Sequence, residues 1–149
     1  MQKYKFTGKT KEVYGRTLNQ IACVTAFSSV AAGDIGGYIE KEANLSQDGN
    51  AWVYGDAKVC GEAILRRGFT EKVTDFIVIG PQGSRSSFAT FHLHSNTVCT
   101  GCFVGNLNEF KKAVYKTHNP DRGGEIYNNQ YQRAIRVFKF LQEQDKDAQ

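Results

Sequence analysis

Residues 50–65 read NAWVYGDAKVCGEAIL, and within them a pattern recurs every six positions. A small residue (Ala51, Ala57 or Ala63) is followed two positions later by an aliphatic one. The pattern continues upstream, with two extra residues at SQDG. Its small residues are Gly37, Ala43, Ala51, Ala57 and Ala63, and their aliphatic partners are Ile39, Leu45, Val53, Val59 and Leu65. One small and one aliphatic inward residue in every six predict a short hexapeptide-type left-handed β-helix over residues 35–68.

This repeat is too short to be stable alone. Its five hexads, at about three per coil, form under two coils, whereas a solenoid needs about three repeat units to bury a continuous core. Other parts of the chain, or another subunit, must therefore cover its ends. An ordinary hairpin over VYGDAKVCG would give the same local alternation, although it would not account for five consecutive matches.

The segment before the repeat predicts a β-hairpin. Residues 3–27 alternate apolar and polar side chains around a turn expected at Thr7–Thr10, with Phe6 on the first arm and Leu18 and Ile21 on the second. The glycines of AAGDIGGYI then supply a loop that leads into the first hexad.

After Gly68 the pattern changes. The runs KVTDFIVIG (72–80), SFATFHLH (87–94) and TVCTGCFVG (97–105) predict a small three-stranded sheet. Asn106 and Glu109 have the spacing of a capping box and begin a helix. A second helix is expected over residues 125–144, with an apolar stripe that would pack against the sheet or a partner chain: Tyr127, Tyr131, Ala134, Phe138 and Leu141.

The predicted fold is therefore mixed α+β in three parts. Residues 1–34 form an N-terminal β-hairpin and loop, residues 35–68 a short hexapeptide β-helix, and residues 69–149 a C-terminal α/β module. A truncated β-helix makes most sense as a rigid platform and an oligomerisation surface, so we expect a homo-oligomer.

Composition limits the classes of partner and compartment. The 149 residues carry 19 Lys and Arg against 15 Asp and Glu, a net charge of +4, which suits a small anionic ligand and does not imply stable nucleic-acid binding. No stretch approaches 18 consecutive apolar residues, so no membrane association is expected. Four cysteines without a secretory signal predict free thiols in the cytoplasm.

Several blocks of the chain resemble a known family. YKFTGKTKEVYGRTL, GDIGGYIEKEANLSQDGNAWVYGDA, IGPQGSRSSFATF and GCFVGNLNEFKKAVYKTH are similar to small phage and prophage proteins with A-x-V-x-G-D/N hexads and a C-terminal IGPxGSR and GCFxGxLxEF module. Members of this family usually carry more hexads than this chain. The resemblance implies phage origin, the cytoplasm of a host bacterium, and a role against host defence that includes capture of nucleotide immune signals.

The loop GPQGSRS (80–86) has the composition of an anion-binding loop. Gly83 allows backbone amides to point into a concave nest, Ser84 and Ser86 add hydroxyl donors, and Arg85 offers a planar fork for two phosphate oxygens. The loop matches neither the phosphate loop of nucleotide triphosphatases nor the dinucleotide-binding glycine fingerprint, and a plain structural turn is the alternative.

The strand after this loop predicts a polar face. Apolar and polar side chains alternate strictly in SFATFHLH, so one face should enter the core. A two-residue turn at Ser95-Asn96 would pair His94 with Thr97 and His92 with Cys99. The opposite face would offer Thr90, His92, His94, Thr97 and Cys99. Such a face is either solvent surface or the floor of a site for an anionic ligand that carries a base or ribose.

Some of these residues also have the spacing of zinc ligands or of a catalytic pair. His-x-His at 92–94 and Cys-x-x-Cys at 99–102 are zinc-ligand spacings, but positions i and i+3 of a regular strand point to opposite faces. A zinc site would therefore require a knuckle at Thr100-Gly101, which the glycine permits, and this alternative stays open. The favoured interpretation of the sequence has no metal and no cofactor. A nucleophile pair of Cys99 and His92 lacks a third orienting group. Hexapeptide β-helices often host acyl transfer with a histidine base, yet residues 35–68 contain no histidine.

The Gly-Ser-Arg loop and the polar strand face predict a protein that sequesters a small phosphate-containing ligand, and the resemblance implies that it is a phage-encoded anti-defence protein whose ligand is a nucleotide-type immune signal. The predicted ligand-binding residues are Gly83, Ser84, Arg85, Ser86, Thr90, His92, His94 and Cys99. Two alternatives remain open. One is an enzyme that cleaves such a nucleotide with His92 or His94 as general acid or base, and the other is a protein that inhibits a host defence protein through its surface.

Overall fold

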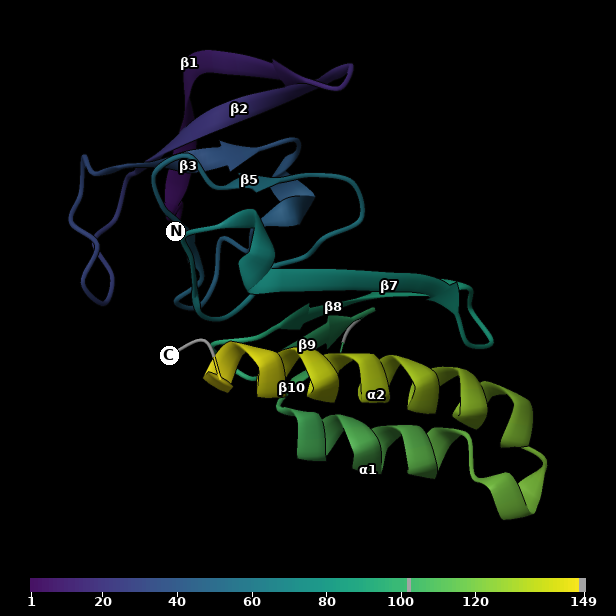
Figure 1. The fold of residues 1–149 in the computed structure, drawn as a ribbon. Helices are drawn as coiled ribbons and strands as arrows, with labels where there is room; N and C mark the ends of the chain where they lie inside the picture. The colour runs from purple at the N-terminus through teal and green to yellow at the C-terminus, as the bar shows by residue number, and fades with distance from the viewer. Residues whose placement is uncertain (102, 148–149) are drawn as a thin grey trace. The chain divides into compact units, whose positions relative to one another are not determined.

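The computed structural model describes residues 1–101 and 103–147. The chain divides into two compact units, an N-terminal unit (Met1–Phe76) and a C-terminal unit (Ile77–Gln149). The fold is mixed α+β, with several sheets, an N-terminal strand pair and two C-terminal helices, as the sequence predicts (Figure 1). Neither α-helix in the described part of the chain combines the length and apolar character that a membrane span requires.

The N-terminal unit contains a four-stranded sheet, a two-stranded sheet and two short 3-10 turns. The four-stranded sheet has the order β1-β2-β3-β5, and in the smaller sheet β4 pairs with β6. The elements are β1 (Tyr4–Val13), β2 (Arg16–Cys23), β3 (Ile35–Ile39), η1 (Glu42–Asn44), β4 (Trp52–Val53), β5 (Lys58–Val59), β6 (Phe69–Thr70) and η2 (Val73–Asp75).

The hairpin turn lies later than predicted. Strands β1 and β2 are antiparallel and meet at Tyr14 and Gly15, both with positive φ, as a two-residue hairpin turn requires. The segment predicted as the turn is a bulge inside β1, where the register shifts between Phe6 and Thr10. Gly8 adopts a φ of +95° there, so this glycine marks a bulge and not a chain reversal.

The repeat segment contains parallel pairings between stretches of the chain that are far apart in sequence. Tyr38 pairs in parallel with Lys58, and Trp52 pairs in parallel with Phe69. An isolated parallel bridge joins Leu45 to Leu65. Three successive stretches of the chain therefore each lie beside a stretch 17–20 positions later in sequence.

The inward side chains follow the predicted period, with one correction. All five aliphatic residues of the series are at most 2% exposed: Ile39, Leu45, Val53, Val59 and Leu65. Of the small residues, Gly37, Ala51, Ala57 and Ala63 are buried, but Ala43 is exposed and Asn44 is buried in its stead. The 3-10 turn η1 rotates the chain at this corner, which brings the Asn44 amide inward. Asn44 Nδ2 donates to the carbonyl oxygens of Gly61 (3.1 Å) and Ala63 (2.8 Å).

Two residues at the start of β1 anchor the hairpin to the repeat segment. Tyr4 is fully buried and its hydroxyl donates to the Leu45 carbonyl at 2.7 Å. Lys3 Nζ donates to the Ala51 carbonyl at 2.8 Å and lies 4.9 Å from the centroid of the Phe27 ring. The hairpin and the repeat segment therefore belong to one unit, which extends to Phe76.

The C-terminal unit has a four-stranded sheet, where the sequence predicted three strands. Its order is β10-β9-β8-β7. The third predicted run folds back on itself, and Phe103 pairs antiparallel with Thr100. The elements are β7 (Phe76–Gln82), β8 (Ser87–His92), β9 (Thr97–Thr100), β10 (Phe103–Gly105), α1 (Leu107–Thr117), η3 (Pro120–Arg122) and α2 (Glu125–Asp147).

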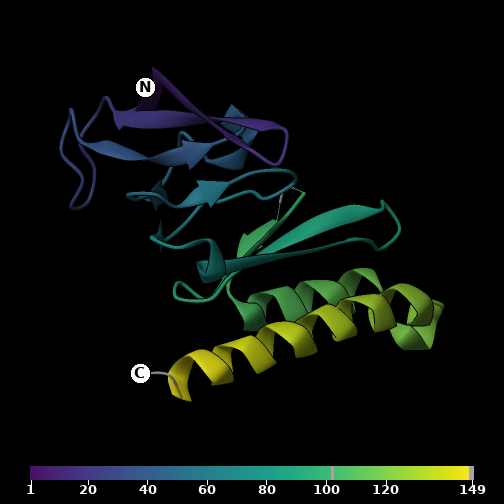
Figure 2. The same ribbon diagram turned by 45° about the horizontal axis from the view of Figure 1, so that its top comes forward.

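Helices α1 and α2 lie side by side and cover one face of this sheet (Figure 2). Helix α1 begins with the predicted capping box, in which Asn106 Oδ1 accepts from the Glu109 amide at 2.8 Å and Glu109 Oε1 accepts from the Asn106 amide at 3.1 Å. The core between sheet and helices consists of Ala89, Phe91, Val98, Leu107, Phe110, Val114, Ala134, Ile135 and Phe138.

Candidate ligand-binding cleft

The loop between β7 and β8 is held in place by helix α2. The Gly83 amide donates to Gln130 Oε1 at 2.7 Å, and the Ser86 amide donates to the Gly83 carbonyl at 3.2 Å. Gly83 has a φ of +78°, and a Cβ atom there would collide with the Tyr131 hydroxyl. A glycine at this position thus lets the loop lie directly on α2.

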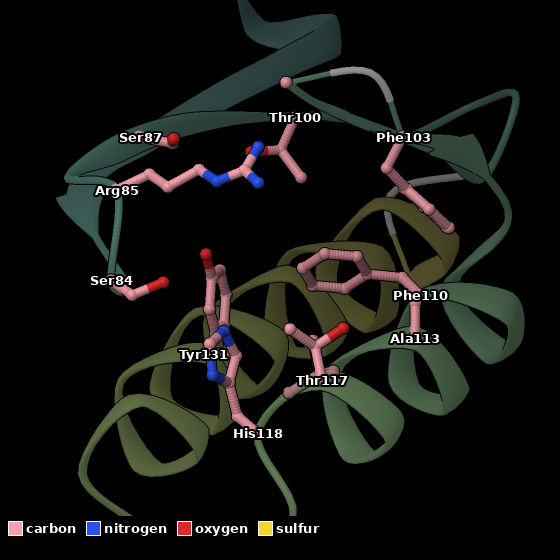
Figure 3. A pocket seen from close by; sticks show the side chains of 12 residues that line it. Ser84, Arg85, Ser87, Thr100, Phe103, Phe110, Ala113, Thr117, His118 and Tyr131 are labelled. Atoms are coloured by element: carbon pink, nitrogen blue, oxygen red, sulfur yellow. The ribbon is translucent and has the colours of Figure 1, made fainter. Parts of the chain in front are cut away.

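This loop forms one edge of a cleft of about 310 Å³, which we call the Arg85 cleft (Figure 3). Its walls come from the β7–β8 loop, the ends of β8, β9 and β10, helix α1 and helix α2. Its lining residues are Ser84, Arg85, Ser87, Thr100, Gly101, Phe103, Phe110, Ala113, Val114, Thr117, His118 and Tyr131.

The polar groups of the cleft are one guanidinium and several hydroxyls. Figure 3 shows the Arg85 side chain extended toward Thr100, with the Ser84 and Tyr131 hydroxyls directed into the same space. Among the described residues, no carboxylate lies within salt-bridge distance of Arg85. No acidic side chain occurs among the lining residues. The guanidinium is therefore available to an anion that enters the cleft.

Aromatic rings form the opposite wall. The His118 and Tyr131 rings are stacked, with centroids 5.6 Å apart and an interplanar angle of 16°. Tyr131 in turn meets Phe110 edge to face at 5.8 Å, and Phe110 lies 5.5 Å from Phe103. Fixed rings beside a cationic group suit a ligand that has both a planar apolar part and a negative charge.

Burial raises the pKa of the Tyr131 hydroxyl above its ordinary value, and the positive charge of Arg85 opposes this shift. Tyr131 therefore stays protonated at neutral pH and presents a hydroxyl donor to the cleft.

The structure separates the predicted site residues into two groups. Ser84 and Arg85 line the cleft, while Gly83 and Ser86 shape the loop without lining it. Alternation along β8 and β9 directs Ser87 and Thr100 to the helix side together with the core residues. It directs three of the four other predicted residues to the opposite side of the sheet, namely Thr90, His92 and Cys99, while His94 lies in the turn after β8. These three side chains are at most 3% exposed, so they do not form an open polar floor beside Arg85.

The predicted pairing around the β8–β9 turn is wrong by two positions. His92 pairs with Thr97, and Thr90 pairs with Cys99. The chain reverses over residues 93–96, so the turn contains four residues and not two. A shift by an even number leaves each side chain on its predicted face, because side chains alternate with a period of two. His94 falls in the turn and is exposed.

His92 is held by its neighbours. Its Nδ1 atom accepts from the Ser95 amide at 3.3 Å and lies 2.9 Å from the Ser95 hydroxyl, and its ring lies 6.2 Å from the His94 ring. Among residues 1–101 and 103–147, no three His, Cys, Asp or Glu side chains gather as a metal site. Cys102, which the zinc hypothesis needs, lies outside the described residues.

None of the four residues of the aromatic wall was predicted as part of the site, and Tyr131 and His118 are the two that carry polar groups. Tyr131 was predicted as part of an apolar stripe, and its phenolic hydroxyl is the signal that it could also face a polar cleft. His118 directly follows the last residue of α1, and its amide donates to the Val114 carbonyl at 2.8 Å. A histidine at a helix end gave no signal by itself, because only tertiary packing brings it to Tyr131.

Comparisons with known proteins give limited similarity. No known protein family matches the chain. A 51-residue stretch, 34% of this chain, is 41% identical to a protein of Escherichia coli strain K12 named uncharacterized acetyltransferase YdcK. The chain spans 15% of the length of that relative. The similarity therefore concerns a part of each protein and assigns no family to the chain as a whole.

Proposed function

We propose that this protein binds and sequesters a small phosphate-containing, nucleotide-type ligand in the Arg85 cleft. One observation carries the proposal: a guanidinium with no carboxylate partner among the described residues extends over a cleft with hydroxyl edges and an aromatic wall. Arginine binds phosphate oxygens in pairs, and aromatic rings stack on bases. The volume of about 310 Å³ is at the small end of the usual range for ligand pockets, which favours a small molecule over a polymer.

The composition of the cleft favours holding a ligand over cleaving it. Its described lining residues include no carboxylate and no cysteine, so the paired groups of general acid-base chemistry and an activated thiolate are both missing. Of the histidines, His118 is the one that lines the cleft, and its ring is stacked on Tyr131. Cleavage by His92 or His94 finds no support, because neither lines the cleft with Arg85.

The first experiment is isothermal titration calorimetry with adenosine and guanosine mono- and dinucleotides, together with chromatography of the recovered ligand. We expect binding by the wild type, recovery of the ligand intact, and a Kd about 10–100-fold higher for Arg85→Ala, the effect of removing a charge-assisted hydrogen-bond donor. Arg133→Ala is the matched control, because Arg133 is exposed on α2 and does not line the cleft.

Three outcomes would contradict the proposal. Equal affinity of Arg85→Ala and wild type would show that Arg85 does not bind the phosphate of the ligand. Recovery of a cleaved ligand would show that the protein is an enzyme. No binding of any nucleotide would favour the remaining alternative, inhibition of a defence protein through the surface.

We further propose that residues 35–68 form a short hexapeptide-type left-handed β-helix. The three parallel pairings at successive stretches and the buried aliphatic series support it. The partial similarity to a protein named as an acetyltransferase is consistent with such repeats. We do not propose acetyl transfer as the activity of this chain, because residues 35–68 contain no histidine and the match covers 15% of the relative.

The biological role is proposed from the resemblance to small phage and prophage proteins. It implies an anti-defence protein in the cytoplasm of an infected bacterium that captures a nucleotide immune signal. The short β-helix adds the expectation that the protein is a homo-oligomer. Native mass spectrometry of wild type and Arg85→Ala purified from infected cells tests this role. A small anion on the wild-type oligomer that is lost in the variant supports it, whereas bare monomers in both samples oppose it.

A further inference from the structure

A second cleft adjoins the first. It has a volume of about 340 Å³, and we call it the Arg122 cleft. It shares Ser84, Thr117 and His118 with the Arg85 cleft, so the two clefts adjoin at these residues. Its lining residues are Ser84, Lys116, Thr117, His118, Asn119, Arg122, Gly123, Gly124 and Tyr127.

The Arg122 cleft is cationic. Lys116 comes from the last turn of α1, and Arg122 ends the short turn η3. The lining residues include no acidic side chain, and neither cation has a carboxylate within salt-bridge distance among the described residues. The Gly124 amide already donates to the Asn119 carbonyl at 2.9 Å, so the attraction for an anion comes from the two side chains.

The boundary between the two clefts is a fixed aromatic cluster. The His118 ring is stacked on the Tyr131 ring at 5.6 Å and lies 5.4 Å from the Tyr127 ring at an interplanar angle of 53°. The buried Asn128 donates from Nδ2 to the His118 carbonyl at 3.1 Å, which fixes the backbone under the ring. The molecule thus presents two cationic pockets with the His118 ring and its tyrosine neighbours at their common edge.

We propose that the ligand carries two separated phosphate groups on a nucleoside framework, one bound by Arg85 and the other by Lys116 and Arg122. This inference rests on the proposed function and specifies its ligand class as a bisphosphorylated nucleotide or a dinucleotide. A single phosphate would leave one cationic pocket without a counter-charge, whereas two phosphates on either side of a stacked base match both pockets.

The test is a calorimetric titration of the full-length protein with three probes: adenosine 5′-monophosphate, adenosine 3′,5′-bisphosphate and the linear dinucleotide pApA, each repeated in the guanosine form. The variants are Arg85→Ala, the double variant Lys116→Ala/Arg122→Ala, and Lys112→Ala. Lys112 is the matched control, because it is exposed on α1 and lines neither cleft.

We expect the wild type to bind one of the two-phosphate probes at least about 10-fold more tightly than the monophosphate, as one more charge-assisted contact provides. The double variant should lose this gain and keep its affinity for the monophosphate. Arg85→Ala should weaken all probes, and Lys112→Ala should weaken none. Whichever of the bisphosphate and pApA has the lower Kd shows whether the ligand is a single bisphosphorylated nucleoside or a dinucleotide.

The two proposals fail in different ways. If no nucleotide binds the wild type, the proposed function itself is wrong. If the monophosphate binds through Arg85 but neither two-phosphate probe gains affinity, the proposed function stands and the two-phosphate inference is overturned. An unchanged affinity of the double variant for the tighter probe overturns it as well.

Discussion

Single residues decide the shape of the cleft. At Gly83 the loop passes so close to helix α2 that a side chain would meet the Tyr131 hydroxyl, and the backbone adopts a positive φ. The repeat segment has a comparable position at Asn44, where one buried amide bonds with three backbone groups.

Gly83→Ala should both destabilise the protein and weaken ligand binding. A non-glycine residue at positive φ costs about 1–3 kcal/mol, and the collision with Tyr131 adds to this cost. Gly123→Ala is the control for stability, because Gly123 has a φ of +84° with no atom within 4 Å of the added Cβ. Urea denaturation of both variants measures the difference. Equal destabilisation would show that the contact with Tyr131 is unimportant.

Asn44→Ala should lower the free energy of unfolding by roughly 2–4 kcal/mol, because it leaves the carbonyls of Gly61 and Ala63 and the Lys41 amide without this partner. Asn50→Ala is the comparison, since Asn50 is exposed and its side chain accepts one long bond of 3.4 Å from the Gly68 amide. Chemical denaturation followed by Trp52 fluorescence suits this test. A cost for Asn44→Ala no larger than that for Asn50→Ala would contradict the structural role.

At the scale of elements, the helical hairpin determines the geometry of the cleft. Helix α1 contributes Phe110 and Thr117, helix α2 contributes Tyr131, and the connection between them contributes His118. The starting point of α1 is fixed by the reciprocal bonds of Asn106 and Glu109. A helix that begins elsewhere would rotate its apolar stripe away from the sheet.

Asn106→Ala should destabilise the protein by about 1 kcal/mol, the usual cost of removing an N-cap side chain. Asn106→Asp retains an oxygen that accepts from the Glu109 amide and should cost less. Asn108→Ala, on the exposed side of the same helix, should change stability by less than about 0.5 kcal/mol. Circular dichroism at the helix band during urea denaturation measures all three. An Asn106→Ala variant as stable as Asn108→Ala would mean that the cap is dispensable.

At the scale of the whole molecule, two buried titratable groups at the start of the chain couple folding to pH. Burial lowers the pKa of Lys3 from 10.5 to about 8, against the smaller opposing effects of Asp48 and Cys23. Burial, with a contribution from Glu42, raises the pKa of Tyr4 from 10.0 to about 12. Between pH 8 and 10.5 the unfolded chain holds the Lys3 proton more tightly than the folded chain does, so stability should rise with pH.

The Tyr4 hydroxyl acts in the opposite direction. Between pH 10 and 12 the unfolded chain loses this proton first, so stability should fall as pH rises. The combined contribution is therefore greatest near pH 10. Lys3→Met should flatten the rise and Tyr4→Phe the fall, relative to wild type in thermal denaturation from pH 7 to 11.5. Because other lysines and tyrosines titrate in this range, the readout is the difference between wild type and variant. Parallel curves would contradict the coupling.

The sequence by itself determined the elements whose signals are local. The six-residue period identified the buried aliphatic series, and the capping box fixed the start of α1, because both depend on neighbours along the chain. The hairpin turn was misplaced, since glycines at bulges and at turns have the same backbone signature. The side of the sheet on which each residue of β8 and β9 lies was predicted correctly despite the wrong turn length, because side chains alternate with a period of two and the register shifted by two residues.

Tertiary structure alone decided which residues share a site. The sequence predicted Arg85 and His92 in one site, yet the sheet separates them, and Arg85 shares its cleft with Thr100, His118 and Tyr131 from later elements. No local pattern encodes such a grouping, because it arises when two helices pack against one face of a sheet and leave the other face to different contacts. A sequence specifies which side of a strand a residue occupies, but only the packed fold determines what lies opposite it.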